Sequence, residues 1–507
     1  MSKKKNNATN NKSSFISDIL YYANPKNLSA EVKRYGYSIS PVKFLFELAV
    51  GLGFAILICK LFELHTFEIM CVCIVCLLLV PFLVRCTYKL KFEQQRFSDV
   101  SGYIEHMLYS FKSTRKVLTS LDEVANTFKD GPMRRKILEA KDAILSSIHG
   151  DVEKEGLKII ENEYRCERVR TMHRFMLKVE NLGGDFGKTI DLLLDDRSMW
   201  VDRQAVMQKD KRRKSLEVVI ASGITLGICW FINNGLPESI SITDNLIYQI
   251  TTTLVVIIDI LLSIYAYSRN SMDWLQNKTT YSSEKVLADY KIIKTWDEKK
   301  ENKNLLVLLV IAGVVALIGF LMKMSALYIS AGVMAFFFFF KNKTKLSSAK
   351  KRIEKEINIK FPRWLMEIAL QLQVENVQNA IGNSIPTAPV VLRDELHTLM
   401  LELEKYPNSV EPYINFMKEF DIPEVTSSMR MLYSLQAGTG GDSETQITDI
   451  IRRNNIMMDK SEKLENENSL TSISTLRLIT EVTAGAMLMV CMGLFLIEFM
   501  SSATSVI

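Results

Sequence analysis

The sequence has few of the residues that usually build catalytic sites. It contains only five histidines in 507 residues, and neither an HExxH nor a GxSxG pattern occurs. Such patterns place metal ligands or a nucleophile together on one helix or turn. The histidines are instead scattered along the chain, at His65, His106, His149, His173 and His397. We therefore expect that the protein is not an enzyme and has no catalytic residues, no cofactor-binding residues and no metal ligands.

Cysteine is also scarce outside apolar sequence. Of eight cysteines, only Cys166 lies in a polar block, so no disulfide framework is indicated. The spacing of Cys71, Cys73 and Cys76 superficially suits a metal, but no histidine or second cysteine pair accompanies it. A thiolate site needs deprotonated ligands, which an apolar helix does not favour. These cysteines are expected to be small apolar side chains.

Strand patterns and a complete phosphate-binding loop are lacking too. Alternating Val, Ile and Thr runs are nearly absent, which argues against a sheet. Residues 183–189 end like a phosphate loop, but Leu182 stands where the motif needs its first glycine. The preceding residues 170–182 have helical spacing, whereas the loop must follow a strand. We therefore expect no nucleotide site at Lys188.

Long apolar runs are what the sequence has in abundance. At 1.5 Å per residue, about 20 residues cross the roughly 30 Å hydrocarbon core of a bilayer. Buried helices of a soluble protein are the alternative, but they rarely contain so much uninterrupted apolar sequence. The pattern predicts an all-α polytopic membrane protein with about seven transmembrane helices, near residues 41–59, 67–84, 215–232, 246–265, 305–322, 325–340 and 478–499.

The flanking charges predict how these helices are oriented. Arg85, Lys89 and Lys91 follow the second run, and residues 209–214 before the third contain five basic residues. The links on the opposite side are nearly free of Lys and Arg. By the positive-inside rule, the amino terminus is expected to be cytoplasmic. The basic residues behind the net charge of +6 are then expected to face the anionic lipids of the cytoplasmic leaflet and not to bind nucleic acid.

These observations divide the chain into nine predicted segments. Two are large polar blocks, 87–214 and 341–477, each read as a small helical bundle of about five or six helices. The others are a cytoplasmic tail at 1–40, a cytoplasmic linker at 269–304 and an external tail at 500–507. Three transmembrane hairpins are expected at 41–86, 215–268 and 305–340, and a last transmembrane helix at 478–499.

The two blocks resemble each other. Phe97 can be set on Phe361, which also aligns two further apolar pairs, Ile104 with Ile368 and Leu108 with Leu372. Beyond a gap of seven residues, Gly183-Gly184-Asp185 falls on Gly440-Gly441-Asp442, and three more pairs align: Met172 with Met429, Ile190 with Ile447 and Leu194 with Ile451. Paired glycines permit a helix to stop sharply, and an aspartate can cap the next helix. The alternative is two unrelated bundles with chance glycines.

Carboxylates inside apolar runs are the remaining candidates for a functional site. Asp259 lies deep in the fourth run, and Glu481 and Glu498 lie in or near the last. Such groups are costly in a membrane and often serve an ion path. They can equally be satisfied by Ser, Thr or Lys on neighbouring helices. A membrane transporter or channel using Asp259, or a membrane-bound sensor, thus stays an alternative function.

Short motifs give the chain a resemblance to a known family. Phe361-Pro362-Arg363-Trp364-Leu365 before an apolar helix, and the glycine corners at 180–184 and 436–441, resemble the type II secretion system F domain family. The chain departs from the family pattern at 373–377, where a Gly-rich turn is missing. Two such domains, each preceded by paired helices, resemble the platform proteins of tight-adherence pili and archaeal-type systems.

The resemblance implies a non-enzymatic inner-membrane platform that forms homo-oligomers. It would couple a cytoplasmic hexameric secretion ATPase to pilin-like subunits for pilus assembly or protein export. Contact with the ATPase is expected to weaken with salt, because basic residues of the first block are candidate contacts. They are Arg134, Arg135, Lys136, Arg168 and Arg170.

Overall fold

The chain forms helices and no strand wherever its structure is described, which confirms the all-α prediction for those residues. The computed structural model describes residues 15–146, 151–183, 186–235, 242–275, 281–321, 325–439 and 442–505. Two compact units are distinguished. The first comprises Met1–Gly102, Val201–Gln276 and Asn466–Ile507, and the second comprises Tyr103–Trp200 and Asn277–Glu465.

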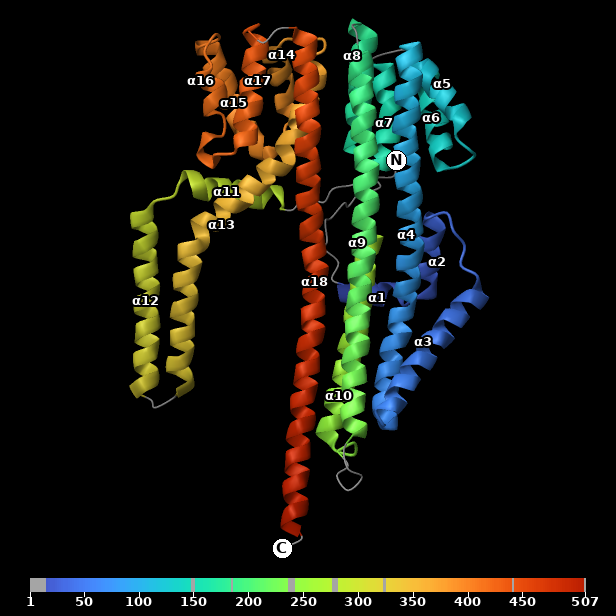
Figure 1. The fold of residues 1–507 in the computed structure, drawn as a ribbon, viewed down its shortest axis with the longest axis vertical. Coiled ribbons are helices and arrows are strands. Elements are labelled where there is room, and N and C mark those ends of the chain that lie inside the picture. The colour runs from blue at the N-terminus through green and yellow to red at the C-terminus, as the bar shows by residue number, and fades with distance from the viewer. Residues whose placement is uncertain are drawn as a thin grey trace, which may run out of the picture. The chain divides into compact units, whose positions relative to one another are not determined.

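The first unit is built mainly from long apolar helices. Its elements are α1 (Phe15–Tyr22), α2 (Pro25–Arg34), α3 (Pro41–Leu61), the first part of α4 (Thr66–Thr114), the last part of α9 (Gly187–Asn234), α10 (Leu246–Ser268), the 3-10 turn η1 (Arg269–Ser271) and the last part of α18 (Ser443–Ser505) (Figure 1).

The second unit contains the remaining elements. From the first predicted block come the end of α4, α5 (Val117–Thr127), α6 (Pro132–Ser146), α7 (Val152–Tyr164), α8 (Glu167–Leu182) and the start of α9. The rest are α11 (Ser283–Lys294), α12 (Glu298–Leu321), α13 (Ser325–Gln371), α14 (Val377–Ser384), η2 (Ile385–Thr387), α15 (Val390–Lys405), α16 (Glu411–Asn415), η3 (Lys418–Phe420), α17 (Pro423–Gln436) and the start of α18.

Within the described residues, five helices are long and apolar enough to cross a membrane, in agreement with five of the seven predicted runs. They are Pro41–Leu61, Thr66–Thr114, Gly187–Phe231, Leu246–Ser271 and Ser443–Met500. The other two predicted runs, 305–322 and 325–340, correspond to α12 and the start of α13, which pack along each other. Residues 322–324 between them lie outside the described residues, and a membrane role for this hairpin stays a prediction.

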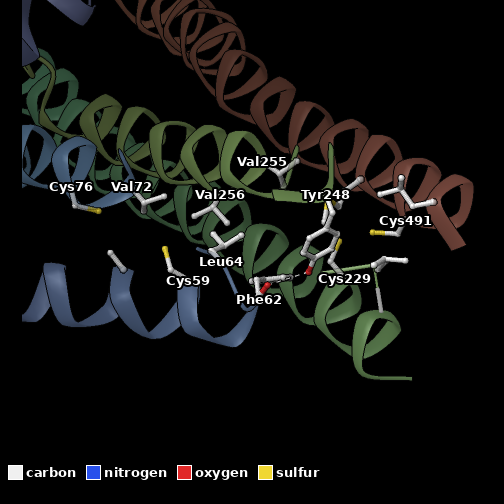
Figure 2. Packing of buried hydrophobic residues seen from close by; sticks show 14 residues of the cluster. Cys59, Phe62, Leu64, Val72, Cys76, Cys229, Tyr248, Val255, Val256 and Cys491 are labelled. Atoms are coloured by element: carbon white, nitrogen blue, oxygen red, sulfur yellow. Dashed lines mark hydrogen bonds between the residues drawn. The ribbon is translucent and has the colours of Figure 1, made fainter. Parts of the chain in front are cut away.

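The core of the first unit joins α3, α4, α9, α10 and α18 through small apolar side chains and cysteines (Figure 2). Tyr248 of α10 is fully buried there, and its hydroxyl donates a hydrogen bond of 3.4 Å to the Phe62 carbonyl at the end of α3. The bond satisfies both a buried phenol and a carbonyl that the end of the helix leaves unpaired. Cys59, Cys76, Cys229 and Cys491 pack in this core as apolar side chains.

The predicted amino-terminal tail contains two helices that sequence reasoning missed. Ile19 and Tyr22 of α1 pack against α4, and the Arg85 guanidinium lies 4.2 Å from the centre of the Tyr22 ring. Leu28 and Val32 of α2 are buried in a further cluster with α4. The predicted disorder at residues 3–13 falls outside the described residues.

In each polar block, four successive helices pack one on the next, and the last packs on the first. In the first, α5 packs on α6, α6 on α7, α7 on α8, and α8 returns to α5. In the second, α14 packs on α15, α15 on α16, α16 on α17, and α17 returns to α14. The largest difference is α7 with 13 residues against α16 with five.

Most of the aligned positions are buried in both blocks. Ile104 and Ile368 are almost inaccessible, and the same holds for the other pairs except Leu194, which is half-buried opposite the buried Ile451. The corner residues Gly184, Asp185, Gly440 and Gly441 lie outside the described residues. Their equivalence therefore stays a prediction.

Helix ends at the predicted corners show why glycine and aspartate occur there. Gly183 ends α8 with φ +72°, and Gly438 follows α17 with φ +64°, a region where side chains are strained. Asp442 caps α18, because its carboxylate accepts the Thr445 backbone N–H at 3.1 Å. The capping role predicted for the aspartate is thus confirmed at Asp442.

Candidate functional site

The described residues contain no group of three or more His, Cys, Asp or Glu that could hold a metal. All eight cysteines are free thiols, and Cys166 is buried in the second unit. Burial raises the pKa of the Cys166 thiol, so it is a poor nucleophile.

The segment that resembles a phosphate loop has the wrong context. It follows helix α8, not a strand, and Lys188 forms an ion pair of 2.8 Å with Glu444 of α18. A phosphate loop instead presents backbone N–H groups between a strand and a helix, with its lysine directed at phosphate. The described part of this segment therefore connects two helices and ties α9 to α18.

A buried network around His173 joins three helices of the second unit. His173 Nε2 lies 2.8 Å from the Tyr103 hydroxyl of α4, and Nδ1 lies 2.9 Å from Glu161 Oε1 of α7. Burial lowers the pKa of His173, although the hydrogen bond to Glu161 opposes this shift. The neutral ring can donate from Nδ1 to Glu161 and accept the Tyr103 hydroxyl at Nε2, so every polar atom of the imidazole is satisfied.

His173 and Glu161 also border a groove of about 1140 Å³ between the two blocks. The walls come from α7 and α8 on one side and from α13, α14 and η2 on the other. Charges of both signs line the groove: the acids are Asp151, Glu153, Glu161, Glu367 and Glu375, and the bases are Lys154, Lys158, Arg170, Arg174 and Lys178.

Ion pairs bridge the groove along a regular spacing. Arg174 of α8 pairs with Glu367 of α13, and one turn further Lys178 pairs with Glu375 at 2.7 Å. Residues four apart share one face of a helix, so the two pairs form a ladder between the blocks. Each pair is partly shielded from solvent, which reduces screening by salt. The ladder joins α8 to α13 at Glu367 and to the turn between α13 and α14 at Glu375.

A second ionic cluster corrects part of the predicted basic patch. Arg168 is not a surface contact: it binds Asp196 through two hydrogen bonds of 2.9 and 3.2 Å and Glu462 through one of 2.8 Å. Its side chain is only 16% exposed and lies over the Trp200 ring at 4.9 Å. Arg170 is committed to Glu161 and Glu167. Periodicity could not reveal this, because the partners lie up to 294 residues apart.

The three predicted intramembrane carboxylates do not form one site. Asp259 of α10 is buried and lies 3.4 Å from the Thr483 hydroxyl of α18. Glu481 is half-exposed and accepts a 3.0 Å hydrogen bond from Arg477 on its own helix. Glu498 is exposed near the end of α18. Among these three, Asp259 is the one held inside the helix packing.

No protein-family model matches the chain, and no curated protein or solved structure is similar to it. The resemblance to the F domain family therefore rests on the motifs quoted above.

Proposed function

We propose that the protein is a non-enzymatic platform of a pilus or secretion machine in the cell membrane. It would couple a cytoplasmic hexameric secretion ATPase to pilin-like subunits. The observation that supports the proposal is a similar helix arrangement in the two polar blocks. A helix containing an apolar run enters a ring of four packed helices (α4 before α5–α8, α13 before α14–α17), and a second helix with an apolar run leaves it (α9 and α18).

This arrangement suits a protein that binds other proteins. Its described interior is filled by apolar side chains and by ion pairs such as that of Arg168 with Asp196. The unbroken helices on either side are stiff, so a force applied to a block reaches the apolar runs without a flexible linker. We propose that the two blocks are copies of one F-type domain and that they receive the ATPase.

The proposed topology has seven spans, with the amino terminus and both blocks in the cytoplasm. The charges around the apolar runs support it. Single cysteines placed near 237 or 505 in a cysteine-free variant should react with an impermeant thiol reagent in intact cells. Cysteines at 153 or 402 should react only after lysis. Labelling of either block from outside would disprove the topology.

The ATPase contact is expected to use charges that remain exposed. Arg135 on α6 is exposed, whereas Arg168 is internal. We expect the full-length protein in detergent to capture its cognate hexameric ATPase better at low salt than at high salt. Arg135→Glu should weaken capture. Arg453→Glu, a charge reversal on the exposed start of α18, is the matched control.

Loss of the gene and nucleotide turnover test the proposal as a whole. Deletion should abolish filaments or secretion while ion flux stays normal, whereas a transporter that uses Asp259 would lose flux on Asp259→Asn and still allow assembly. The purified protein should hydrolyse no ATP. Turnover that Lys188→Ala abolishes would refute the platform function.

A further inference from the structure

Asp259 has an environment that no other part of the proposed function explains. It lies in the apolar helix α10 with 2% of its surface exposed, and its Oδ2 atom has no hydrogen-bond partner among the described residues. No described Lys or Arg forms an ion pair with it. An isolated carboxylate in a bilayer costs about 3 kcal/mol or more, so a charged Asp259 would be strongly unfavourable here.

The contact with Thr483 indicates where a proton lies. The Thr483 hydroxyl lies 2.8 Å from the carbonyl oxygen of Thr480, one turn earlier on α18, which is the nearer acceptor for its single proton. Its distance to Asp259 Oδ1 is longer, 3.4 Å. A hydroxyl group whose proton is already used in one hydrogen bond can still accept another through its oxygen lone pairs. It can therefore accept a hydrogen bond from a protonated Asp259, but it cannot donate fully to a charged one.

A row of polar groups continues from Asp259 along the contact between α10 and α9. Ser263, four residues later, lies 3.4 Å from the Ser222 hydroxyl. Further along, the Ser215 hydroxyl lies 2.9 Å from the Lys211 carbonyl of its own helix, 3.0 Å from the Ala266 carbonyl and 3.2 Å from Asn270 Oδ1. Residues 259, 263 and 266 share one face of α10, and Asn270 follows in η1. The row ends at the buried Asn270, next to the partly exposed Arg269.

The titratable groups around Asp259 do not supply a counter-charge. The buried core that includes Val255 and Val256 contributes the thiols Cys229 of α9, Cys491 of α18 and Cys76 of α4. On α18, the charged residue Arg477 is bound to Glu481. On α9, Glu217 is held by Lys214 and Arg213. Neutralisation by a proton is the remaining way to stabilise the buried carboxyl.

We propose that Asp259 is a reversible proton-binding site inside the membrane helices, and that the row of Ser222, Ser263, Ser215 and Asn270 gives protons access to it. The proton is the ligand, and the carboxyl is neutral in the resting protein. The site does not depend on the platform function, because it follows from the packing of α9, α10 and α18 alone.

An apolar carbodiimide tests the protonation state. A protonated carboxyl adds across one C=N bond of the reagent to give an O-acylisourea, which rearranges to an N-acylurea without losing any atom. We expect mass spectrometry of the full-length protein, treated in lipid vesicles, to find one added reagent on Asp259. Asp259→Asn should lose this adduct. Absence of the adduct from Asp259, with reaction only at Glu481 or Glu498, would overturn the proposal.

Isotope exchange tests reversibility and the access route. The infrared C=O band of the protonated acid, identified by its loss in Asp259→Asn, should shift when the vesicles are moved into D₂O. A band that never shifts would overturn reversible binding. Ser263→Ala should slow the shift, whereas Thr253→Val, which removes a buried α10 hydroxyl bonded to its own helix, should not. Equal rates in these two variants would overturn the access route.

Discussion

Replacing Arg168 by Met is the most informative perturbation of the second unit. The change keeps an unbranched side chain over Trp200 but removes the charge shared by Asp196 and Glu462. Both carboxylates are at most 10% exposed, so neither can be rehydrated in place. Removing one partner of a buried ion pair typically costs about 3–5 kcal/mol. Because two acids lose the same cation, we expect a value at the upper end.

Thermal unfolding of the full-length protein in detergent measures this cost. Trp200 lies on the guanidinium, so tryptophan fluorescence reports the affected region. In a unit of this size, 1 kcal/mol corresponds to roughly 2 °C in the unfolding midpoint. Arg168→Met should therefore lower the midpoint by about 6–10 °C, if the loss is 3–5 kcal/mol.

Two controls separate burial from charge. Arg452→Met removes an exposed cation paired with Asp449 on the same helix, and such pairs contribute less than about 1 kcal/mol. Combining Arg168→Met with Asp196→Asn and Glu462→Gln neutralises the stranded acids, so much of the lost stability should return. Equal effects of Arg168→Met and Arg452→Met would refute the argument from burial.

Three further predictions concern the same unit and use the same unfolding assay. Gly156→Ala should destabilise the unit by about 1–3 kcal/mol, because the new Cβ would lie 2.5 Å from Ile144 and 2.9 Å from a backbone oxygen. Gly382→Ala should stabilise it by roughly 0.4–1 kcal/mol, because the nearest atom lies 3.6 Å from the new Cβ. The opposite order would contradict the packing of α6 on α7. Because the pKa of His173 is lowered in the folded state, the unfolded chain binds the extra proton at a higher pH. At pH values below about 6.5, the free energy of unfolding should therefore decrease by up to 1.4 kcal/mol per pH unit. A His173→Gln variant with the same pH dependence would disprove this. Lys178→Glu should lower the midpoint and Glu375→Lys in the same chain should restore it; failure of the double variant to recover would mean that the ladder does not join the blocks.

Sequence periodicity predicted the helices because burial repeats every three to four residues. Ile104 and Leu108 recur at the spacing of one buried helix face, and both are buried. Local turn chemistry was equally readable: α6 begins at Pro132, directly after the Asp-Gly turn, and Asp442 caps α18. These features depend on neighbours within a few residues, which a single sequence contains.

Contacts between distant segments could not be read in the same way. Arg168 has the composition of a surface residue, and only the folded chain brings Glu462 to it. The short helix α1 escaped notice because eight residues give little periodic signal. For Asp259, the sequence left open an ion path or a carboxyl satisfied by a neighbouring helix, and its contact with Thr483 is seen only when α10 and α18 are packed together.

The shared helix order of the two blocks has a consequence for symmetry. When two identical subunits associate, every surface occurs twice, and any substitution changes both copies at once. Here both blocks belong to one chain, so a substitution in α7 leaves α16 untouched. The third helices of the two blocks differ in length, with 13 residues in α7 and five in α16. One chain can thus keep two similar cores while offering two different faces, and a ring of such chains would present alternating, not identical, surfaces.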